Sequence, residues 1–268
     1  MLSWLAYLIA DLVSRALPAR AVDGLAVALA RVAFALRLPA RRALAANLER
    51  LLPGTGTLER RALARAAFEQ FALSLGEFLR LDRMAPGRLA GAIEVRGIEH
   101  LAAARASGRG VILLSAHLGN WEWGAAFLGA EGEKIHLVAR PHPSPLVEAF
   151  FARRRRAWGV SSLSGSPLWR DAARALRRRE WVALMSDRGT HRRTAPVCAW
   201  AAALARRTGA LVLPGVMVRI GAGRYAACFG PPLSPEACRR GDLRSLRPFL
   251  ERYPGQWCAF EPLPEGLA

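Results

Sequence analysis

The sequence predicts an α/β fold, with a mixed, mostly parallel central sheet flanked by helices and a helical N-terminal portion. Two observations predict this class. Apolar residues recur at helical spacing through residues 1–90, and short β-rich runs alternate with helical stretches from residue 93 onward. No internal repeat, low-complexity tract or long linker divides the 268 residues. We expect a helical portion over 1–90 and an α/β core over 91–268, joined as one continuous domain.

Helices are expected throughout the N-terminal portion. After the opening segment they cover residues 25–36, 41–52 and 58–81. Pro-Gly pairs at 53–54 and 86–87 punctuate this portion. The core-facing stripe of the long last helix consists of Leu63, Phe71, Leu75, Phe78 and Leu79.

The opening segment is amphipathic. Met1–Ala10 is uncharged and apolar, but Asp11 and Arg15 interrupt it, so no run reaches the roughly 18 apolar residues that a membrane-spanning helix needs. One helical stripe consists of Leu5, Leu8, Ile9, Leu12 and Ala16, with Trp4 and Tyr7 near its edge. The stripe fits a helix lying in a bilayer interface and fits a helix covering the core equally well. We expect the portion over 1–90 to contact the membrane, and we expect no cleaved leader, because a basic start is missing.

The second portion alternates between two periodicities. Strands are expected at 93–95, 111–115, 135–139, 181–185, 211–218 and 225–229. Helices are expected at 99–106, 121–128, 145–158, 168–178 and 199–207. Such alternation is typical of βαβ units, in which crossover helices join parallel strands.

The chain is strongly basic. It has 39 basic against 21 acidic residues, a formal net charge of +18, and Lys134 is its only lysine. A surface this basic attracts phospholipid headgroups, an acidic carrier protein, a phosphorylated substrate or nucleic acid, and charge alone does not choose among them. No helix-turn-helix, zinc or RNA-binding signature accompanies the arginines, so a nucleic-acid-binding module is disfavoured.

The cysteines do not indicate a metal site. The chain has four, widely spaced and without a C-x-x-C pair: Cys198, Cys228, Cys238 and Cys258. This usage indicates buried or incidental thiols in a reducing compartment rather than a zinc site.

The most specific local pattern is a strand that leads into a histidine and a turn. The buried run Val111–Leu114 leads to His117, Gly119 permits a tight turn, and Asn120 is a good N-cap for the helix that follows. Glu122 falls in the first turn of that helix. We therefore expect the turn to fold the Glu122 carboxylate back toward the imidazole of His117.

Such a pair suits acyl transfer. A neutral imidazole takes the proton from a hydroxyl as that hydroxyl adds to a thioester carbonyl, while a carboxylate on the other ring nitrogen fixes the tautomer. General-base help of this kind contributes on the order of 10²–10⁴ in rate. Free N–H groups at the helix start, or a nearby arginine, would bind the oxyanion. The spacing alone is weak, because five histidines give about 0.4 chance matches, and a purely structural hydrogen-bonded pair is the alternative.

Segments spread over nearly the whole chain add a family resemblance. His117-Leu-Gly-Asn-Trp-Glu122 resembles the signature of the bacterial lipid A biosynthesis acyltransferases, the late lauroyl and myristoyl transferases, within the lysophospholipid acyltransferase superfamily that carries an H-x4-D/E motif. The supporting segments, in the family's order, are Arg41-Arg42, Asn47-Leu48, Leu52-Pro53, Gly76-Glu77, Val95–Leu101, Gly108–Leu114, Ala139–Pro141, Arg155 to Gly159, Asp187-Arg188, Leu204–Ala210 and Pro254–Trp257. Together they are far more specific than any one of them.

The resemblance implies transfer of a fatty acyl group from an acyl carrier protein thioester, or less often acyl-CoA, to a hydroxyl of a lipid A precursor or related glycolipid. It implies that His117 is the base and Glu122 its partner, and that neither a metal nor a cofactor is needed. The other residues implied to line the site, by binding phosphate, helping to hold the oxyanion or shaping the loop, are Asn120, Arg140, Arg155 and Asp187. It implies a location at the cytoplasmic face of the inner membrane, against an anionic lipid surface.

Two departures from the family pattern leave the acceptor open. After Asp187 the family usually has a longer loop with a Phe-Phe-Gly element, whereas Arg192–Trp200 is shorter and lacks it. The closing segment Gln256–Pro262 lacks the arginine that commonly follows the tryptophan in the family. Both segments lie where acceptor or membrane contacts are expected. A lysophospholipid, an aminolipid or another glycolipid is therefore the alternative acceptor, and a lipid-binding scaffold without activity is a further alternative.

Overall fold

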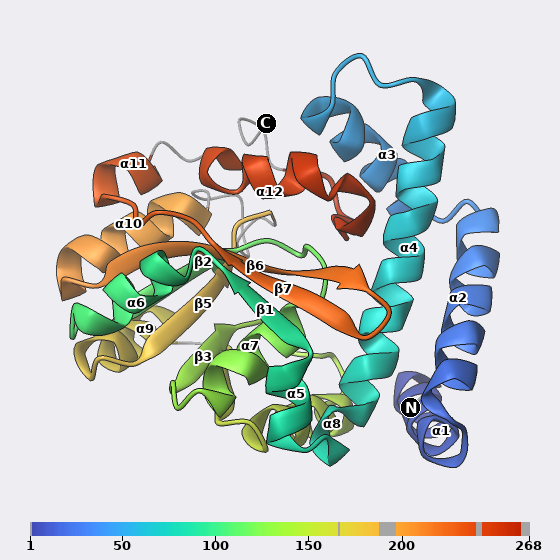
Figure 1. Cartoon of the computed structure of the whole chain (residues 1–268), viewed down its shortest axis with the longest axis horizontal. Coiled ribbons are helices and arrows are strands. Elements are labelled where there is room, and N and C mark those ends of the chain that lie inside the picture. The colour runs from blue at the N-terminus through green and yellow to red at the C-terminus, as the bar shows by residue number, and fades with distance from the viewer. Residues whose placement is uncertain (1, 166, 188–196, 240–242, 264–268) are drawn as a thin grey trace.

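The computed structural model contains a seven-stranded sheet covered by helices, and it describes residues 2–165, 167–187, 197–239 and 243–263 (Figure 1). The strand order is β1-β7-β6-β2-β5-β3-β4. Neighbouring strands are parallel except β6 and β7, which form an antiparallel hairpin. The strands are β1 (Ile93–Arg96), β2 (Val111–Ser115), β3 (Ile135–Val138), β4 (Val160–Leu163), β5 (Trp181–Met185), β6 (Leu211–Gly221) and β7 (Arg224–Phe229). The predicted mixed, mostly parallel α/β class is confirmed.

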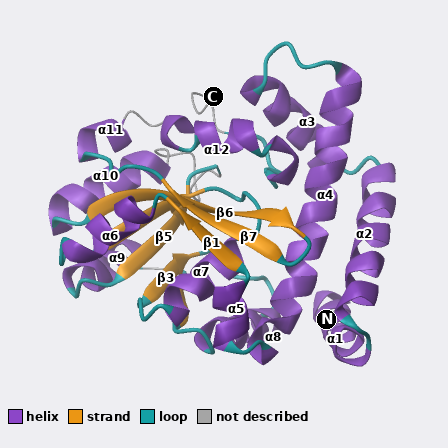
Figure 2. Ribbon diagram, in the orientation of Figure 1, coloured by secondary structure: helices purple, strands orange, loops and turns teal. Residues whose placement is uncertain are grey.

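Helices surround this sheet, as Figure 2 shows. The first four form the N-terminal portion, α5 precedes the first strand, and α6 to α11 each follow a strand. The α-helices are α1 (Leu2–Ala16), α2 (Ala19–Ala35), α3 (Pro39–Leu51), α4 (Thr57–Arg80), α5 (Pro86–Gly91), α6 (Ile98–Ala106), α7 (Trp121–Ala130), α8 (Pro145–Arg156), α9 (Leu168–Arg177), α10 (Val197–Thr208), α11 (Pro235–Arg239) and α12 (Arg247–Arg252). Short 3₁₀ turns are η1 (Leu81–Arg83), η2 (Leu243–Ser245) and η3 (Pro254–Gln256).

Strand β2 lies in the middle of the sheet, between β6 and β5. Successive side chains of a strand point to opposite faces. Ile112 and Leu114 accordingly pack in the cluster formed with α9 and α10, whereas Val111 and Leu113 pack in the cluster that contains α7 and α8. Burial on both faces explains why this strand is a continuous apolar run in the sequence.

Strand β4 has no counterpart among the sequence predictions. Its residues Val160–Leu163 include two serines, and the strand lies at the edge of the sheet beyond β3. An edge strand buries less surface than a central one, so its sequence does not need the apolar run by which the other strands were predicted.

Helix α4 connects the N-terminal helices to the sheet. Along its length it contacts α1, α2, α3 and α7. In the middle of α4, Ala67 and Phe68 pack in the cluster that includes Phe34 of α2, and near its end Phe78 and Leu79 join the cluster that covers β2. The helical portion thus shares its core with the sheet, and the expected boundary near residue 90 remains a prediction.

Helix α1 presents its apolar stripe to the outside. Leu5, Ile9 and Leu12 are 53%, 52% and 56% exposed. The helix packs instead through Trp4 and Tyr7, the residues expected at the edge of the stripe, against two phenylalanines of α8. Of the two alternatives that the sequence left open for this stripe, the one in which it covers the core does not agree with these exposures.

Helix α2 continues this outward apolar surface. Its exposed apolar residues are Leu25, Leu29 and Val32, with Leu36 just after it. In Figure 1 both helices lie beyond α4, away from the sheet. Among the described residues, no helix is long and apolar enough to cross a membrane.

Candidate active site

The loop after β2 carries His117 and is held by backbone hydrogen bonds from two directions. Gly119 donates its N–H to the carbonyl of Gln256, at 3.0 Å, and Asn120 donates to the carbonyl of Met217 on β6, at 2.9 Å. Gly119 has a φ of +67°, and a Cβ there would lie 2.0 Å from the carbonyl oxygen of Met217. The turn therefore requires glycine for its backbone conformation and for the close approach of β6.

The partner of His117 is Asp187, at the carboxyl end of β5. The imidazole Nδ1 lies 2.8 Å from Oδ1 of Asp187, and the backbone N–H of His117 donates to Oδ2 at 2.9 Å. The indole Nε1 of Trp257 donates to the same Oδ2, also at 2.9 Å. Because a carboxylate only accepts hydrogen bonds, Nδ1 carries the ring proton and Nε2 is left as the basic nitrogen.

Asp187 is 1% exposed, and its surroundings favour the ionised form. Burial by itself raises the pKa of this carboxyl, but the electrostatic interaction with His117 and the three hydrogen bonds from His117 and Trp257 outweigh it, so the pKa of Asp187 lies below its ordinary value. The sequence predicts Asp187 in the site, but it does not predict the hydrogen bond between Asp187 and the His117 ring.

Glu122 is not in the position that the sequence predicted. Its carboxylate receives two hydrogen bonds from Arg155 of α8, Nε to Oε2 at 3.0 Å and Nη2 to Oε1 at 2.5 Å. The Asn120 side chain caps α7 by accepting from the N–H of Trp123, and the first helical turn then directs Glu122 toward α8. The expected contact of Glu122 with the second nitrogen of His117 is corrected accordingly: Asp187 holds Nδ1.

Arg155 explains this arrangement of Glu122. Arg155 is only 8% exposed, and its buried guanidinium needs a counter-charge. Burial lowers the pKa of Arg155, but the Glu122 carboxylate outweighs burial and keeps that pKa above its ordinary value. The third nitrogen, Nη1, donates to Ser162 at 2.9 Å. The bidentate pair thus joins the start of α7 to α8 and β4.

Asn120 is fully buried and belongs to a second polar network, on the α4 side of the loop. Its Nδ2 donates to Glu77 of α4 at 2.7 Å, and the Tyr225 hydroxyl donates to the same carboxylate. Arg219 forms an ion pair with Glu77 at 2.8 Å. Burial, followed by the Glu77 charge, raises the pKa of Tyr225 well above its ordinary value, so the phenol stays protonated. The network fixes the turn from behind.

A cavity of about 660 Å³ opens beside these groups. Its polar lining is formed by His117, Asn120, Glu122, Arg140, His142 and Arg155. Its apolar lining includes Leu137, Leu168, Trp169, Leu184, Val197 and Trp200. Further apolar and aromatic lining residues are Tyr7, Phe71, Leu75, Phe78, Trp121 and Phe151. An elongated apolar group with one polar end fits such a lining.

Arg140 follows β3 and lines the same cavity at a more open position. Its side chain is 43% exposed, and Nη1 lies 3.2 Å from a carboxylate oxygen of Glu261. Of the predicted site residues, the cavity therefore brings together His117, Glu122, Asn120, Arg140 and Arg155, while Asp187 lies behind His117. The shortened loop over 188–196 lies outside the described residues.

Two site residues had no predicted role. Trp257 stood in the sequence only as part of a P-x-Q-W match, and its donation to Asp187 spans 70 residues, which no local spacing reveals. His142 lines the cavity and stacks on Phe151, and burial holds the pKa of His142 below its ordinary value. A histidine that follows a strand does not reveal in the sequence that it lines a cavity or contacts Phe151.

Comparison with known proteins gives a family match. The chain matches a family model described as "Bacterial lipid A biosynthesis acyltransferase" over residues 1–243. Among solved structures it is similar to the crystal structure of the 1-acyl-sn-glycerophosphate (LPA) acyltransferase from Thermotoga maritima, with 15% identity over 69% of this chain and 77% of that chain and a TM-score of 0.36. Comparison with curated proteins gives no match.

Replacing Gly119 with alanine is expected to destabilise the protein far more than the same change at Gly223. Both glycines have positive φ, +67° and +65°, but a Cβ at Gly223 meets nothing within 4 Å. Gly223→Ala should cost about 1–2 kcal/mol, and Gly119→Ala should exceed that by at least about 2 kcal/mol because β6 must move. Urea unfolding of both variants measures the difference, and equal losses would contradict the close approach.

Asp187→Asn is expected to lower stability in a pH-dependent way. The folded-state pKa of Asp187 lies below its unfolded value of about 3.9. Its stabilising contribution is therefore full above that unfolded pKa and is lost as pH falls through the folded pKa. The difference in unfolding free energy between wild type and variant should be large at pH 7 and narrow below about pH 4. A difference that stays constant down to pH 3 would exclude an ionised Asp187.

Proposed function

The chain belongs to the bacterial lipid A biosynthesis acyltransferase family, and from this premise we propose that it moves a fatty acyl group from an acyl carrier protein thioester, or acyl-CoA, to a hydroxyl of a lipid A precursor or related glycolipid. It is an acyltransferase that acts on lipid-type substrates. The observation that best supports the specific reaction is a histidine, held by a buried carboxylate, that lines an apolar cavity of about 660 Å³.

His117 is the proposed general base. Its Nε2 takes the proton of the acceptor hydroxyl as the oxygen attacks the thioester carbonyl, and the resulting imidazolium is stabilised by Asp187 through Nδ1. Collapse of the tetrahedral intermediate breaks the carbon–sulfur bond, and the imidazolium returns the proton to the departing thiolate. These steps call on no metal or cofactor, and no covalent enzyme intermediate forms.

The first turn of α7 is the proposed oxyanion site. In the preceding turn, the N–H groups of Gly119 and Asn120 already donate to the backbone carbonyls of Gln256 and Met217, so they do not serve the oxyanion. The N–H groups of Trp121 and Glu122 lie at the helix start, where the helix dipole favours negative charge, and the Trp121 ring contacts the His117 ring. Asn120 supports this site by capping the helix rather than by meeting the oxyanion directly.

The two arginines of the cavity differ in what they offer a substrate. Arg155 has its donors engaged by Glu122 and Ser162, which supports a role in ordering the helix start. Arg140 lies at the open side of the cavity with a weaker, half-exposed ion pair. We therefore assign a phosphate of the acceptor to Arg140 and the placement of α7 to the Glu122–Arg155 pair.

A different acceptor, such as a lysophospholipid, an aminolipid or another glycolipid, is the second candidate. The observation that favours it is the short segment after Asp187, which lacks the family's Phe-Phe-Gly element. Mass-spectrometric lipid profiles of the host with and without this chain would decide, because the lipid class that loses one acyl chain is the acceptor.

The location proposed is the cytoplasmic face of the inner membrane. The outward apolar residues of α1 and α2 support contact with a bilayer, and the net charge of +18 supports binding to anionic lipid and to an acidic carrier protein. No nucleic acid partner is proposed.

His117→Ala is expected to abolish acyl transfer without unfolding the protein, and Asp187→Asn to reduce it by about 10²-fold or more, because the ring loses its fixed tautomer. Trp257→Phe removes just one of the hydrogen-bond donors to the Asp187 carboxylate, so it should reduce acyl transfer less than Asp187→Asn does. The measurement is product formation from acyl carrier protein thioester and lipid acceptor in detergent, with circular dichroism as the folding control. Full activity in a folded His117→Ala protein would reject the mechanism.

Replacing Leu5, Ile9 and Leu12 together with serine is expected to weaken sedimentation with lipid vesicles by at least about tenfold, because their apolar surface no longer enters the bilayer. The matched control replaces three apolar residues elsewhere whose exposure is similar or greater, Leu58, Ile98 and Leu146. Equal losses in the two triple variants would remove α1 as the membrane contact.

A further inference from the structure

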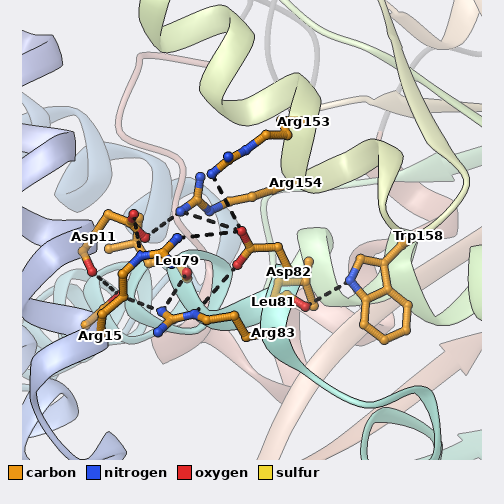
Figure 3. A network of polar contacts seen from close by, with 10 residues as sticks. Asp11, Arg15, Leu79, Leu81, Asp82, Arg83, Arg153, Arg154 and Trp158 are labelled. Atoms are coloured by element: carbon orange, nitrogen blue, oxygen red, sulfur yellow. Dashed lines mark hydrogen bonds and ion pairs between the residues drawn. The ribbon is translucent and has the colours of Figure 1, made fainter.

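Four arginines gather around two aspartates where α1 meets η1 and α8. We call this group the arginine cluster. As Figure 3 shows, it joins Arg15 and Asp11 of α1, Asp82 and Arg83 of η1, and Arg153 and Arg154 of α8. Four cations against two carboxylates leave the cluster with a formal charge of +2, so it lacks negative charge.

Asp82 stands at the centre of the cluster without a close partner. The nearest guanidinium nitrogens lie 3.8 Å away on Arg83 and Arg153, 3.9 Å on Arg15 and 4.0 Å on Arg154. All of these exceed hydrogen-bond distance, and Oδ1 of Asp82 is buried with no hydrogen-bond partner. The carboxylate therefore balances part of the charge, but it does not occupy the donors of the arginines around it.

Arg154 is fully buried, and two of its nitrogens are also unsatisfied. Its Nη2 pairs with Asp11 at 2.5 Å, but neither Nε nor Nη1 has a hydrogen-bond partner. Its guanidinium stacks on Phe150 at 3.6 Å from the ring centroid. A buried cation in this state is costly, and an anion placed close by would offset the cost.

The accessible donors of the cluster border the apolar surface of α1. Arg153 is 68% exposed and its contact with Asp82 is long. Arg15 is 41% exposed, uses Nε for Asp11, and lies on the same helix as the outward residues Ile9 and Leu12. An anion held here would therefore sit at the rim of the surface that we propose enters the bilayer, at the depth of lipid headgroups.

We propose that the arginine cluster is a binding site for the phosphate group of an anionic phospholipid, held by Arg15 and Arg153 over the buried charge of Arg154. The inference rests on the proposed membrane contact and adds a defined headgroup site to it. A phosphate oxygen accepts charge-assisted hydrogen bonds from the two exposed guanidiniums, and the acyl tails of the same lipid lie along the stripe of α1.

The site also concerns the cavity. Arg154 and Arg155 are neighbours on α8, yet Arg154 faces the cluster and Arg155 faces the cavity. Tyr7, one helical turn before Asp11, lines the cavity and packs on Phe151. A lipid held by the cluster would therefore fix α1 in the position in which it forms a cavity wall.

The test compares two double variants of the full chain. Arg15→Gln with Arg153→Gln removes the accessible donors, while Arg20→Gln with Arg37→Gln removes two exposed charges around the neighbouring α2. Binding is measured to phosphatidylglycerol vesicles, to phosphatidylcholine vesicles, to monomeric dihexanoyl-phosphatidylglycerol and to inorganic phosphate.

The cluster variant is expected to bind phosphatidylglycerol vesicles about 30-fold more weakly, to lose the short-chain lipid, and to bind phosphatidylcholine as wild type does. The control variant should lose much less affinity for phosphatidylglycerol vesicles and for the short-chain lipid. Equal losses in both variants would overturn the site in favour of diffuse charge, and inorganic phosphate binding as tightly as the short-chain lipid would overturn the lipid assignment.

The failure of the two proposals can be told apart. If no vesicle binds but the short-chain lipid binds through Arg15 and Arg153, the membrane contact fails and the headgroup site stands. If wild type binds both kinds of vesicle equally and does not bind the short-chain lipid, the headgroup site fails and the apolar contact stands.

Discussion

A carboxylate that is 1% exposed, Asp187, accepts hydrogen bonds from the ring and the backbone of His117 and from the indole of Trp257. Each donor lowers the free-energy cost of burying an ionised group in such a place, so the loss of any one of them raises that cost. The loop after β2, the end of β5 and the segment after η3 are thereby held in one arrangement. The ring orientation, the direction of its free nitrogen and the start of α7 all depend on this contact.

The two acidic residues near the imidazole have separate tasks. Asp187 holds the ring, whereas Glu122 neutralises Arg155 and joins α7 to α8. A histidine followed five positions later by an acid therefore locates this site in the sequence, but the spacing does not predict which groups bind each other. The acid at that spacing organises the helix start, and the acid that touches the histidine comes from the neighbouring strand.

Sequence patterns predicted the architecture because periodicity is a local property. The central strand, the turn at Gly119 and the cap at Asn120 each follow from residues close together in the chain. The contacts of Asp187 do not, because they join residues 70 positions apart. Periodicity also predicted the apolar stripe on α1, but not whether it faces the core or the outside. A helix with an apolar stripe and aromatic residues beside it can bury either side.

The position of Trp257 in the chain has a consequence for how the site forms during synthesis. His117 and Asp187 are synthesised before the indole that completes the donor set of Asp187, which follows Asp187 by 70 residues. A nascent chain that stops short of this tryptophan can form all seven strands and still have a carboxylate with a missing donor. The full donor set of Asp187 therefore forms only after the residues of all seven strands have been synthesised.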